Sequence, residues 1–206
     1  MKMGMILFLA NWLGKEEYDI TSFPRGLLPP LALIGSAFAL IMLQPDLGTG
    51  TVMFGAALMM VFTAGARMKH LLSLGVAGVA GFVALVAAAP YRLQRITAFL
   101  DPWSDPLGAG YQIIQSLYAI GPGGLGGLGL GMSRQKYSYV PEPQTDFIFS
   151  ILAEELGFIG GLAVLILFLI LIWRGMKVAM SLPDRVGSYL AVGIVCMVAV
   201  QVIINI

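Results

Sequence analysis

Charged residues are scarce in this chain of 206 residues: Asp, Glu, Lys and Arg together make up only 11% of it. A water-soluble domain carries about a quarter of its residues as charges, so a soluble globular domain and a disordered segment are excluded. Lys and Arg exceed Asp and Glu by a net charge of only +1, which excludes a nucleic-acid binder. The lone Cys196 excludes a disulfide scaffold. Apolar residues make up 58% and the mean hydropathy is +0.88, which together predict an integral membrane protein.

Six apolar stretches predict membrane helices, because about 20 apolar residues cross a hydrocarbon core as a helix. Runs such as LAVLILFLILIW lack the alternation of period two that a membrane barrel needs. We therefore expect an all-α, polytopic membrane protein that forms a single transmembrane domain over residues 1–206. The stretches are 3–13, 27–43, 47–66, 71–89, 147–173 and 186–206.

Both ends of the chain have unusual sequences for a membrane protein. Lys2 followed by MGMILFLANWLG resembles a secretory signal, but the charged KEEYD follows in place of a small-residue cleavage site. The C-terminal sequence VQVIINI lacks a polar tail. We therefore expect a fragment of a longer polytopic protein whose first helix here is incomplete.

Cations indicate the orientation, because basic residues in short loops stay on the cytoplasmic side of a membrane. With six alternating helices, loops 14–26, 67–70 and 174–185 share one side and contain most of the Lys and Arg. The long stretch 90–146 then lies on the other side. We predict a multi-pass protein of the bacterial cytoplasmic membrane with 90–146 outside the cytoplasm.

The external stretch contains a possible amphipathic helix at 111–120 and a glycine tract at 121–131. The tract lacks the G-x-x-x-x-G-K-[ST] sequence of a phosphate loop. Two other interpretations stay open: a mobile linker or close helix packing, and a bare backbone that approaches a bulky ligand.

Carboxyl groups at membrane depth are costly and are therefore candidate functional groups. Asp46, Asp146, Glu154 and Glu155 qualify. Asp46 also fits a structural turn, and Asp146 fits a helix cap. In a continuous helix, Glu154 would lie about 12 Å along the axis from Asp146 and about 80° around it, one-third of the way into the span. Glu142, between two prolines, also fits a solvated loop charge.

The single histidine, His70, lies beside Arg67 and Lys69 and is predicted to be a juxtamembrane surface residue. With no cysteine or second histidine near it in the sequence, we expect no metal site there.

Several long motifs resemble the SEDS family of bacterial wall-building membrane proteins, which comprises FtsW, RodA and SpoVE; the FtsW and SpoVE branches are nearer than RodA. The resemblance extends over essentially all of the chain. The motifs are QPDLGTGTV (44–52), AGAR (64–67), APYRLQRITAFLDPWSDPLGAGYQIIQSL (89–117), GLGLGMSRQKYSYVPEPQTDFIF (127–149) and AEELGFIGG (153–161).

The resemblance implies about ten membrane helices and a large external loop between the seventh and eighth. On that pattern the chain would begin in the fourth helix and end in the ninth, and by itself it would be inactive. The helix count, loop position and orientation agree with those derived above from hydropathy and charge.

The resemblance further implies a peptidoglycan glycosyltransferase that polymerises lipid II outside the membrane, working with a class B penicillin-binding protein. In the family, the aspartate of the T-D-F-I-F motif is catalytic, which here is Asp146. Glu142, Arg134 and Lys136 fall in the same external loop and are weaker substrate-binding candidates. Division, elongation and sporulation roles all fit this resemblance.

The chemistry of lipid II polymerisation suits these residue types. A base must take the proton of a sugar C4 hydroxyl as it attacks an anomeric carbon, while undecaprenyl diphosphate leaves; direct displacement would invert that carbon. We predict Asp146 as the base. We predict that cations bind the leaving diphosphate, for which a divalent ion such as Mg²⁺ is also suited. The candidate cations are Arg92, Arg95, Arg134 and Lys136.

Two other functions stay open. A lipid II flippase would carry the same substrate across the bilayer without forming a bond, but transporters more typically place their polar groups near the bilayer midplane on broken helices. A non-catalytic scaffold for the division or sporulation machinery would leave the surroundings of Asp146 without a task.

Overall fold

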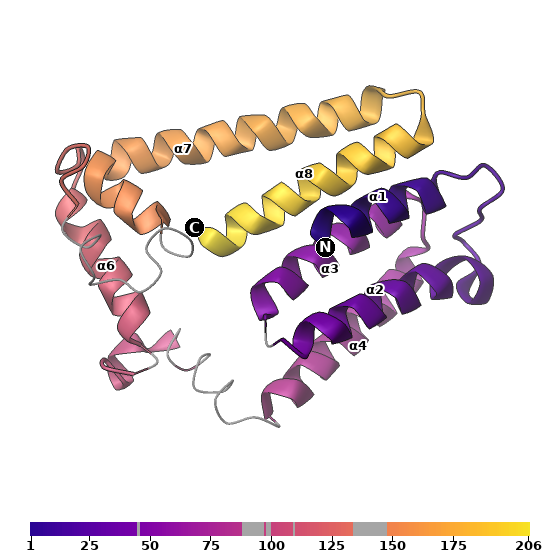
Figure 1. Cartoon of the computed structure of the whole chain (residues 1–206), viewed down its shortest axis with the longest axis horizontal. Coiled ribbons are helices and arrows are strands. Elements are labelled where there is room, and N and C mark those ends of the chain that lie inside the picture. Colours follow the sequence, from indigo (N-terminus) through magenta and orange to yellow (C-terminus); the bar gives the residue numbers. More distant parts are fainter. Residues whose placement is uncertain (45, 88–96, 98–99, 109, 134–147) are drawn as a thin grey trace. The chain divides into compact units, whose positions relative to one another are not determined.

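The computed structural model describes residues 1–44, 46–87, 97, 100–108, 110–133 and 148–206 (Figure 1). Every regular element within these ranges is a helix, which confirms the predicted all-α class. Each of the six predicted apolar stretches forms a helix, and these are α1 (Lys2–Leu13), α2 (Leu28–Met42), α3 (Leu47–Thr63), α4 (Met68–Ala87), α7 (Ile148–Ser181) and α8 (Arg185–Asn205).

Three helical stretches in the described part are long and apolar enough to cross a membrane: Phe23–Met42, Ile148–Ser181 and Arg185–Asn205. The first of them combines α2 with the preceding π-helical turn η1 (Phe23–Leu27). Shorter apolar helices occur at Lys2–Leu13 and Gly48–Thr63. The chain is a polytopic membrane protein.

The chain divides into two compact units. Unit 1 comprises Met1–Gly75 with Phe168–Ile204, and unit 2 comprises Val76–Leu167 with Asn205–Ile206. Whether residues 1–206 behave as one transmembrane domain stays a prediction.

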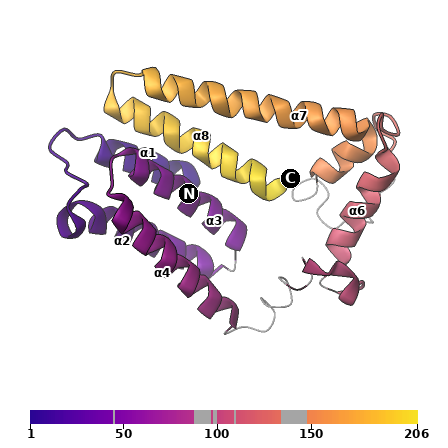
Figure 2. The same cartoon turned by 180° about the vertical axis from the view of Figure 1, so that it is seen from behind.

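Unit 1 is built around α3, which packs against both α1 and α2 (Figures 1 and 2). Its core includes Leu9 of α1 and Met60 of α3, both fully buried. At Gly193 of α8 an added Cβ would lie 2.6 Å from both the Ile6 Cγ2 and the Met60 Sδ. Small residues of this kind let membrane helices approach closely.

The end of α7 and α8 up to Ile204 also belong to unit 1, where they run side by side. Ser188 Oγ donates a hydrogen bond to the Ala179 carbonyl oxygen at 2.7 Å. At the other end of α8, Lys2 Nζ donates to Gln201 Oε1 at 2.9 Å and joins α8 to α1. These two polar contacts join α8 to α7 and to α1 within unit 1.

The predicted loop 174–185 is mostly helical, because α7 continues to Ser181. Arg174 and Lys177 consequently lie on the last turns of this helix. Lys177 Nζ lies 4.8 Å from the centroid of the Trp173 ring, a cation–π contact. Long cationic side chains can keep their charge in the headgroup region while the stem covers apolar surface, so the helix need not end where the apolar run ends.

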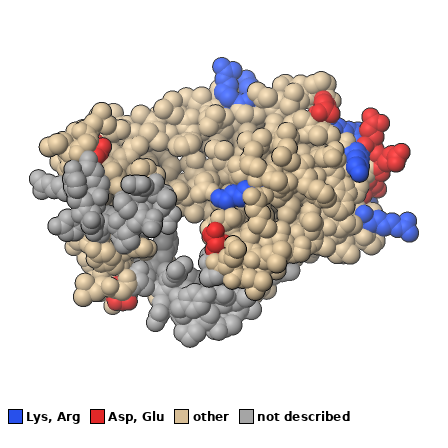
Figure 3. Space-filling model, in the orientation of Figure 1, with Lys and Arg blue, Asp and Glu red and all other residues tan. Residues whose placement is uncertain are grey.

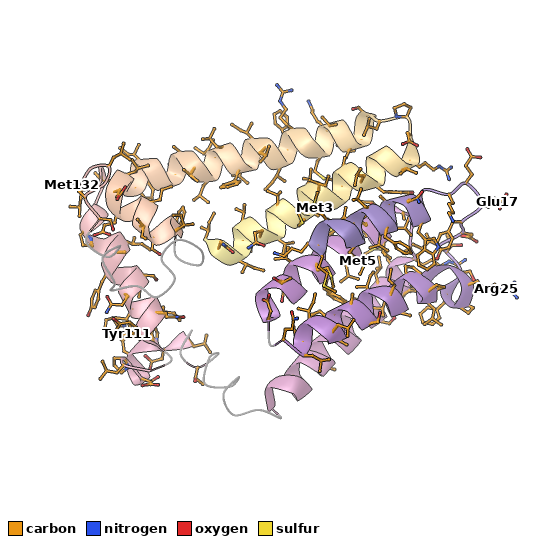
Figure 4. All side chains as sticks on the ribbon, viewed as in Figure 1. Met3, Met5, Glu17, Arg25, Tyr111 and Met132 are labelled. Atoms are coloured by element: carbon orange, nitrogen blue, oxygen red, sulfur yellow. The ribbon has the colours of Figure 1, made fainter. Side chains whose placement is uncertain are left out.

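Charged side chains gather at one end of unit 1, where Glu17 and Arg25 lie (Figures 3 and 4). In the loop at this end, Asp19 accepts hydrogen bonds from the Thr21 hydroxyl at 2.6 Å and from the Thr21 backbone N–H at 2.9 Å. These bonds, the hydroxyl first, hold the pKa of Asp19 below its usual range. His70 is half-buried with its ring edge-on to Phe23, 5.1 Å between centroids, so it is less exposed than predicted.

Asp46 forms the N-cap of α3, which confirms the structural interpretation of this residue. Its side chain accepts a hydrogen bond from the Thr49 backbone N–H at 3.0 Å. Such a cap satisfies one of the amide groups that the first turn of a helix leaves without a partner. The Thr49 backbone N–H, followed by the Thr49 hydroxyl, lowers the pKa of Asp46.

Unit 2 contains α6 (Tyr111–Gly123) and the short 3-10 helix η2 (Pro102–Ser104), which contact each other. The Trp103 and Tyr118 rings meet edge to face at 6.0 Å between centroids. The predicted helix at 111–120 is confirmed and continues three residues further. Unit 2 also contains the N-terminal part of α7, up to Leu167.

The cap at Asp46 predicts an acid-dependent stability. Because its pKa is lower in the folded than in the unfolded chain, the stabilisation is fully present above the ordinary carboxyl pKa and is lost as the pH falls through the folded-state value. Asp46→Asn keeps a capping group but does not titrate. We therefore expect its melting temperature to fall less than that of the wild type between neutral and acidic pH. Asp46→Ala should cost at most about 1 kcal/mol at pH 7. Thermal unfolding in detergent checks both, and equal acid slopes for wild type and Asp46→Asn would contradict this role.

Candidate functional site

The residues predicted to carry the chemistry lie outside the described part of the chain. Their roles therefore stay predictions. They are the catalytic candidate Asp146 and the substrate-binding candidates Arg92, Arg95, Arg134, Lys136 and Glu142. The structure does describe both segments that flank 134–147, namely 110–133 and α7, and these segments form a closely packed junction within unit 2.

The junction forms where α7 is broken. Gly157 has φ 69° and ψ −168°, which is not a helical conformation. The break separates a short segment, 148–156, from a long segment, 158–181, and Figure 1 shows the ribbon changing direction between them. A short helical segment, 148–156, therefore precedes the long segment of α7.

The glycine tract replaces the helical hydrogen bonds that this break removes. The carbonyl oxygens of Glu154 and Glu155 would normally accept from the amides four residues on. Instead, Leu128 N–H donates to the Glu154 carbonyl oxygen and Gly129 N–H donates to that of Glu155, both at 3.0 Å.

The amides beyond the break also bond to the tract. Phe158 N–H donates to the Gly124 carbonyl oxygen at 2.9 Å, and Ile159 N–H donates to that of Leu125 at 3.2 Å. All four backbone groups at the break are thus satisfied, which matters because a polar group without a partner costs several kcal/mol in hydrocarbon surroundings.

Glycine is required at several positions of this junction. Gly127 has φ 79°, and a Cβ on it would overlap the Glu155 carbonyl oxygen. A Cβ on Gly157 would overlap the Gly127 amide nitrogen. A Cβ on Gly123 would likewise overlap the Ala153 carbonyl oxygen. Of the two interpretations of the tract that stayed open, the structure supports close helix packing.

A buried hydrogen bond joins the end of the 110–133 segment to the short segment of α7. Ser133 Oγ donates to Glu154 Oε2 at 2.5 Å, and the Ser133 backbone N–H donates to Glu155 Oε1 at 3.4 Å. Both Ser133 and Glu154 are only 1% exposed. Glu154 therefore has a buried hydrogen-bond partner in Ser133.

The assumption of one continuous helix through Glu154 and Glu155 was wrong, and their depth in the membrane stays a prediction. The expected helix was continuous from residue 147, whereas Gly157 ends the first segment. The long segment of about 24 residues rises about 36 Å, which by itself crosses a hydrocarbon core of about 30 Å. Both carboxyl groups lie on the short segment that precedes the break.

A family model described as "Cell cycle protein", that of FtsW, RodA and SpoVE, matches residues 1–206. The chain belongs to this family. Stage V sporulation protein E of Bacillus subtilis (strain 168) is 61% identical to it over 206 residues, an alignment that covers 100% of this chain and 56% of that protein. A protein of Geobacter sp. (strain M18), named probable peptidoglycan glycosyltransferase FtsW, is 40% identical over 204 residues, or 99% of this chain and 56% of the relative.

A solved structure also resembles this member of the FtsW, RodA and SpoVE family. It belongs to a peptidoglycan synthase complex that coordinates polymerization and crosslinking, and it matches with a TM-score of 0.76 and 33% identity over 99% of this chain and 56% of that one. The chain thus spans about half the length of the relatives it matches.

Sequence reasoning missed Ser133 and Gly157. Glycine is common in membrane helices, so Gly157 within a long apolar run did not signal a break. Ser133 is separated from Glu154 by 21 positions, and no local pattern indicates such a bond. Among the described residues, no group of three or more His, Cys, Asp or Glu side chains could hold a metal ion.

Substitutions at the junction test whether its glycines are required. We expect Gly157→Ala and Gly127→Ala each to lower stability by about 2 kcal/mol, because each forces a side chain into positive φ and against backbone atoms. Gly126→Ala is the matched control, since no atom lies within 4 Å of an added Cβ there. Melting temperatures of the full-length variants in detergent check this, and equal values for all three would contradict the packing described.

Proposed function

We propose that this chain is part of a peptidoglycan glycosyltransferase that polymerises lipid II at the outer face of the cytoplasmic membrane. The observation that carries this proposal is the similarity of the whole chain to proteins named probable peptidoglycan glycosyltransferase and to a peptidoglycan synthase complex. The similarity to stage V sporulation protein E adds spore cortex synthesis to cell division as a setting.

Asp146 acts as the general base in this proposal. It deprotonates the C4 hydroxyl of one lipid-linked disaccharide as that oxygen attacks the anomeric carbon of the growing chain. The bond to undecaprenyl diphosphate breaks, and the cations Arg92, Arg95, Arg134 and Lys136 stabilise the charge on this leaving group. Glu142 is a further substrate-binding candidate in the same loop.

The geometry of α7 supports a site at the membrane surface. Because the segment 158–181 is long enough to cross the bilayer, the break at Gly157 falls near one end of the span. Arg174 and Lys177 lie near the opposite end of this segment and indicate the cytoplasmic side. Position 146 then belongs outside, where a lipid-linked sugar can reach it.

A broken helix also occurs in transporters, which favours a lipid II flippase as a second candidate. Transporters, however, place such breaks near the bilayer midplane, between two half-helices. Here the short segment of about nine residues rises only about 13 Å, and the long one spans by itself. This asymmetry favours chemistry at the surface over transport.

The proposed partner is a class B penicillin-binding protein that crosslinks the strands. The support comes from the solved relative, which is part of a complex that coordinates polymerization with crosslinking. Assays of function therefore need the full-length protein together with this partner.

Removing the charge of Asp146 tests the proposed chemistry. We expect Asp146→Asn in the full-length protein, purified with its partner, to lower lipid II polymerisation by at least about 10²-fold, the lower end of the range for a general base. The control is Asp184→Asn: Asp184 Oδ2 caps the start of α8 by accepting from Gly187 N–H at 2.8 Å, and asparagine caps as well. Polymerisation retained by Asp146→Asn would reject the role of Asp146, and transport of lipid II without new glycosidic bonds would favour the flippase.

Cysteine labelling tests the proposed orientation. In a full-length protein without other cysteines, including Cys196→Ala, we expect Leu107→Cys to react with a membrane-impermeant maleimide on intact cells. Leu107 is 90% exposed and lies in the 90–146 stretch. Pro183→Cys, in the connection between α7 and α8, should react only after permeabilisation. The reverse pattern would place position 146 in the cytoplasm and end the proposed mechanism.

A further inference from the structure

The Ser133–Glu154 hydrogen bond closes a loop of the chain that contains most of the proposed reactive groups. Ser133 directly precedes the 134–147 stretch, and Glu154 lies on the short α7 segment that follows it. That stretch includes Asp146 together with the cations Arg134 and Lys136. A buried polar contact thus joins the two described ends that flank the loop.

We propose that Ser133 and Glu154 are positioning residues that fix Asp146 for proton transfer. This inference rests on the proposed function. Ser133 Oγ donates to Glu154 Oε2 and thereby fixes the short segment 148–156 in its rotation about the helix axis and in its position along that axis. Asp146 precedes Ile148 by only two positions, so the chain keeps it within about 7 Å of that helix start.

The short segment needs such a contact because Gly157 removes it from the hydrogen-bond ladder of the long one. Backbone N–H groups of the glycine tract donate hydrogen bonds to the carbonyl oxygens of Glu154 and Glu155, at the C-terminal end of the short segment. Those bonds fix the end of the segment at the break, and the Glu154 side chain adds a contact directed away from the axis. Two kinds of contact in different directions determine the rotation of a helix better than one.

Small rotations would matter for catalysis. A rotation of about 10° moves a group that lies about 5 Å from the helix axis by about 1 Å. A displacement of about 1 Å can cost about 10²-fold in rate when a reacting group must be held in line. The pair therefore acts on the rate of the chemical step more than on substrate binding.

Glu154 is placed for positioning and not for proton transfer to substrate. The residue is 1% exposed, and one of its carboxylate oxygens accepts the hydrogen bond from Ser133 Oγ. A base for a lipid-linked sugar must be within hydrogen-bond reach of the sugar hydroxyl. This burial separates the role of Glu154 from that of Asp146.

Kinetics of the full-length protein with its partner test this inference. We expect Ser133→Ala and Glu154→Leu each to lower kcat for lipid II polymerisation by about 10-fold or more, with KM changed by less than about 2-fold. The effects of the two substitutions should not add in the double variant, because both remove the contact that the two residues share. Glu154→Gln, which keeps an oxygen acceptor for the Ser133 hydroxyl, should recover kcat to within about 3-fold of wild type.

The control for losing a serine hydroxyl in unit 2 is Ser116→Ala. Ser116 Oγ donates to the Ile113 carbonyl oxygen of its own helix at 2.9 Å, and its loss should leave kcat unchanged. All variants are assayed below their melting temperatures and after co-purification with the partner. If Glu154→Leu does not accumulate, Ser133→Ala decides the question.

Two results would overturn the inference. In the first, Ser133→Ala lowers the melting temperature but leaves kcat unchanged, which assigns the pair to stability alone. In the second, Glu154→Gln abolishes polymerisation as completely as Asp146→Asn, which makes Glu154 a catalytic group. If Asp146→Asn itself retains polymerisation, the proposed function fails instead, so the two failures are distinguishable.

Discussion

Backbone polar groups in apolar surroundings must find partners, and this requirement governs the part of the structure nearest the proposed site. A break in α7 frees two carbonyl oxygens and two amide groups. The glycine tract satisfies all four, and it can approach only because Gly127 and Gly157 lack side chains. The break and the tract therefore depend on each other: neither is a stable arrangement without its partner.

The same requirement explains how much of the fold the sequence could predict. Apolar runs of sufficient length must form helices in a bilayer, so the helices α1, α2, α3, α4, α7 and α8 could be predicted from hydropathy. Their ends were less predictable. The α7 helix continues through Arg174 and Lys177 to Ser181, because cationic side chains can remain hydrated at the membrane surface while the backbone stays helical.

The candidate site was less predictable, because its contacts connect distant parts of the chain. Asp146 qualified as a candidate from its place beside an apolar run, but its catalytic role came from the family motif, and it lies outside the described residues. The candidate carboxyl group Glu154 could be recognised from its position within an apolar run. Its partner Ser133 could not, since the bond depends on how the glycine tract turns around Gly157. A continuous helix was the simpler expectation, and glycine alone gave no reason to abandon it.

The break at Gly157 also has a mechanical consequence. In an unbroken helix, twisting one end turns the other, because consecutive hydrogen bonds form a stiff rod. Here the rod is interrupted, and the backbone bonds to residues 124–129 bridge the two pieces. Torque that the bilayer or a bound protein applies to the long piece therefore reaches the short piece through these bonds and the Gly157 linkage, and not along one continuous helix.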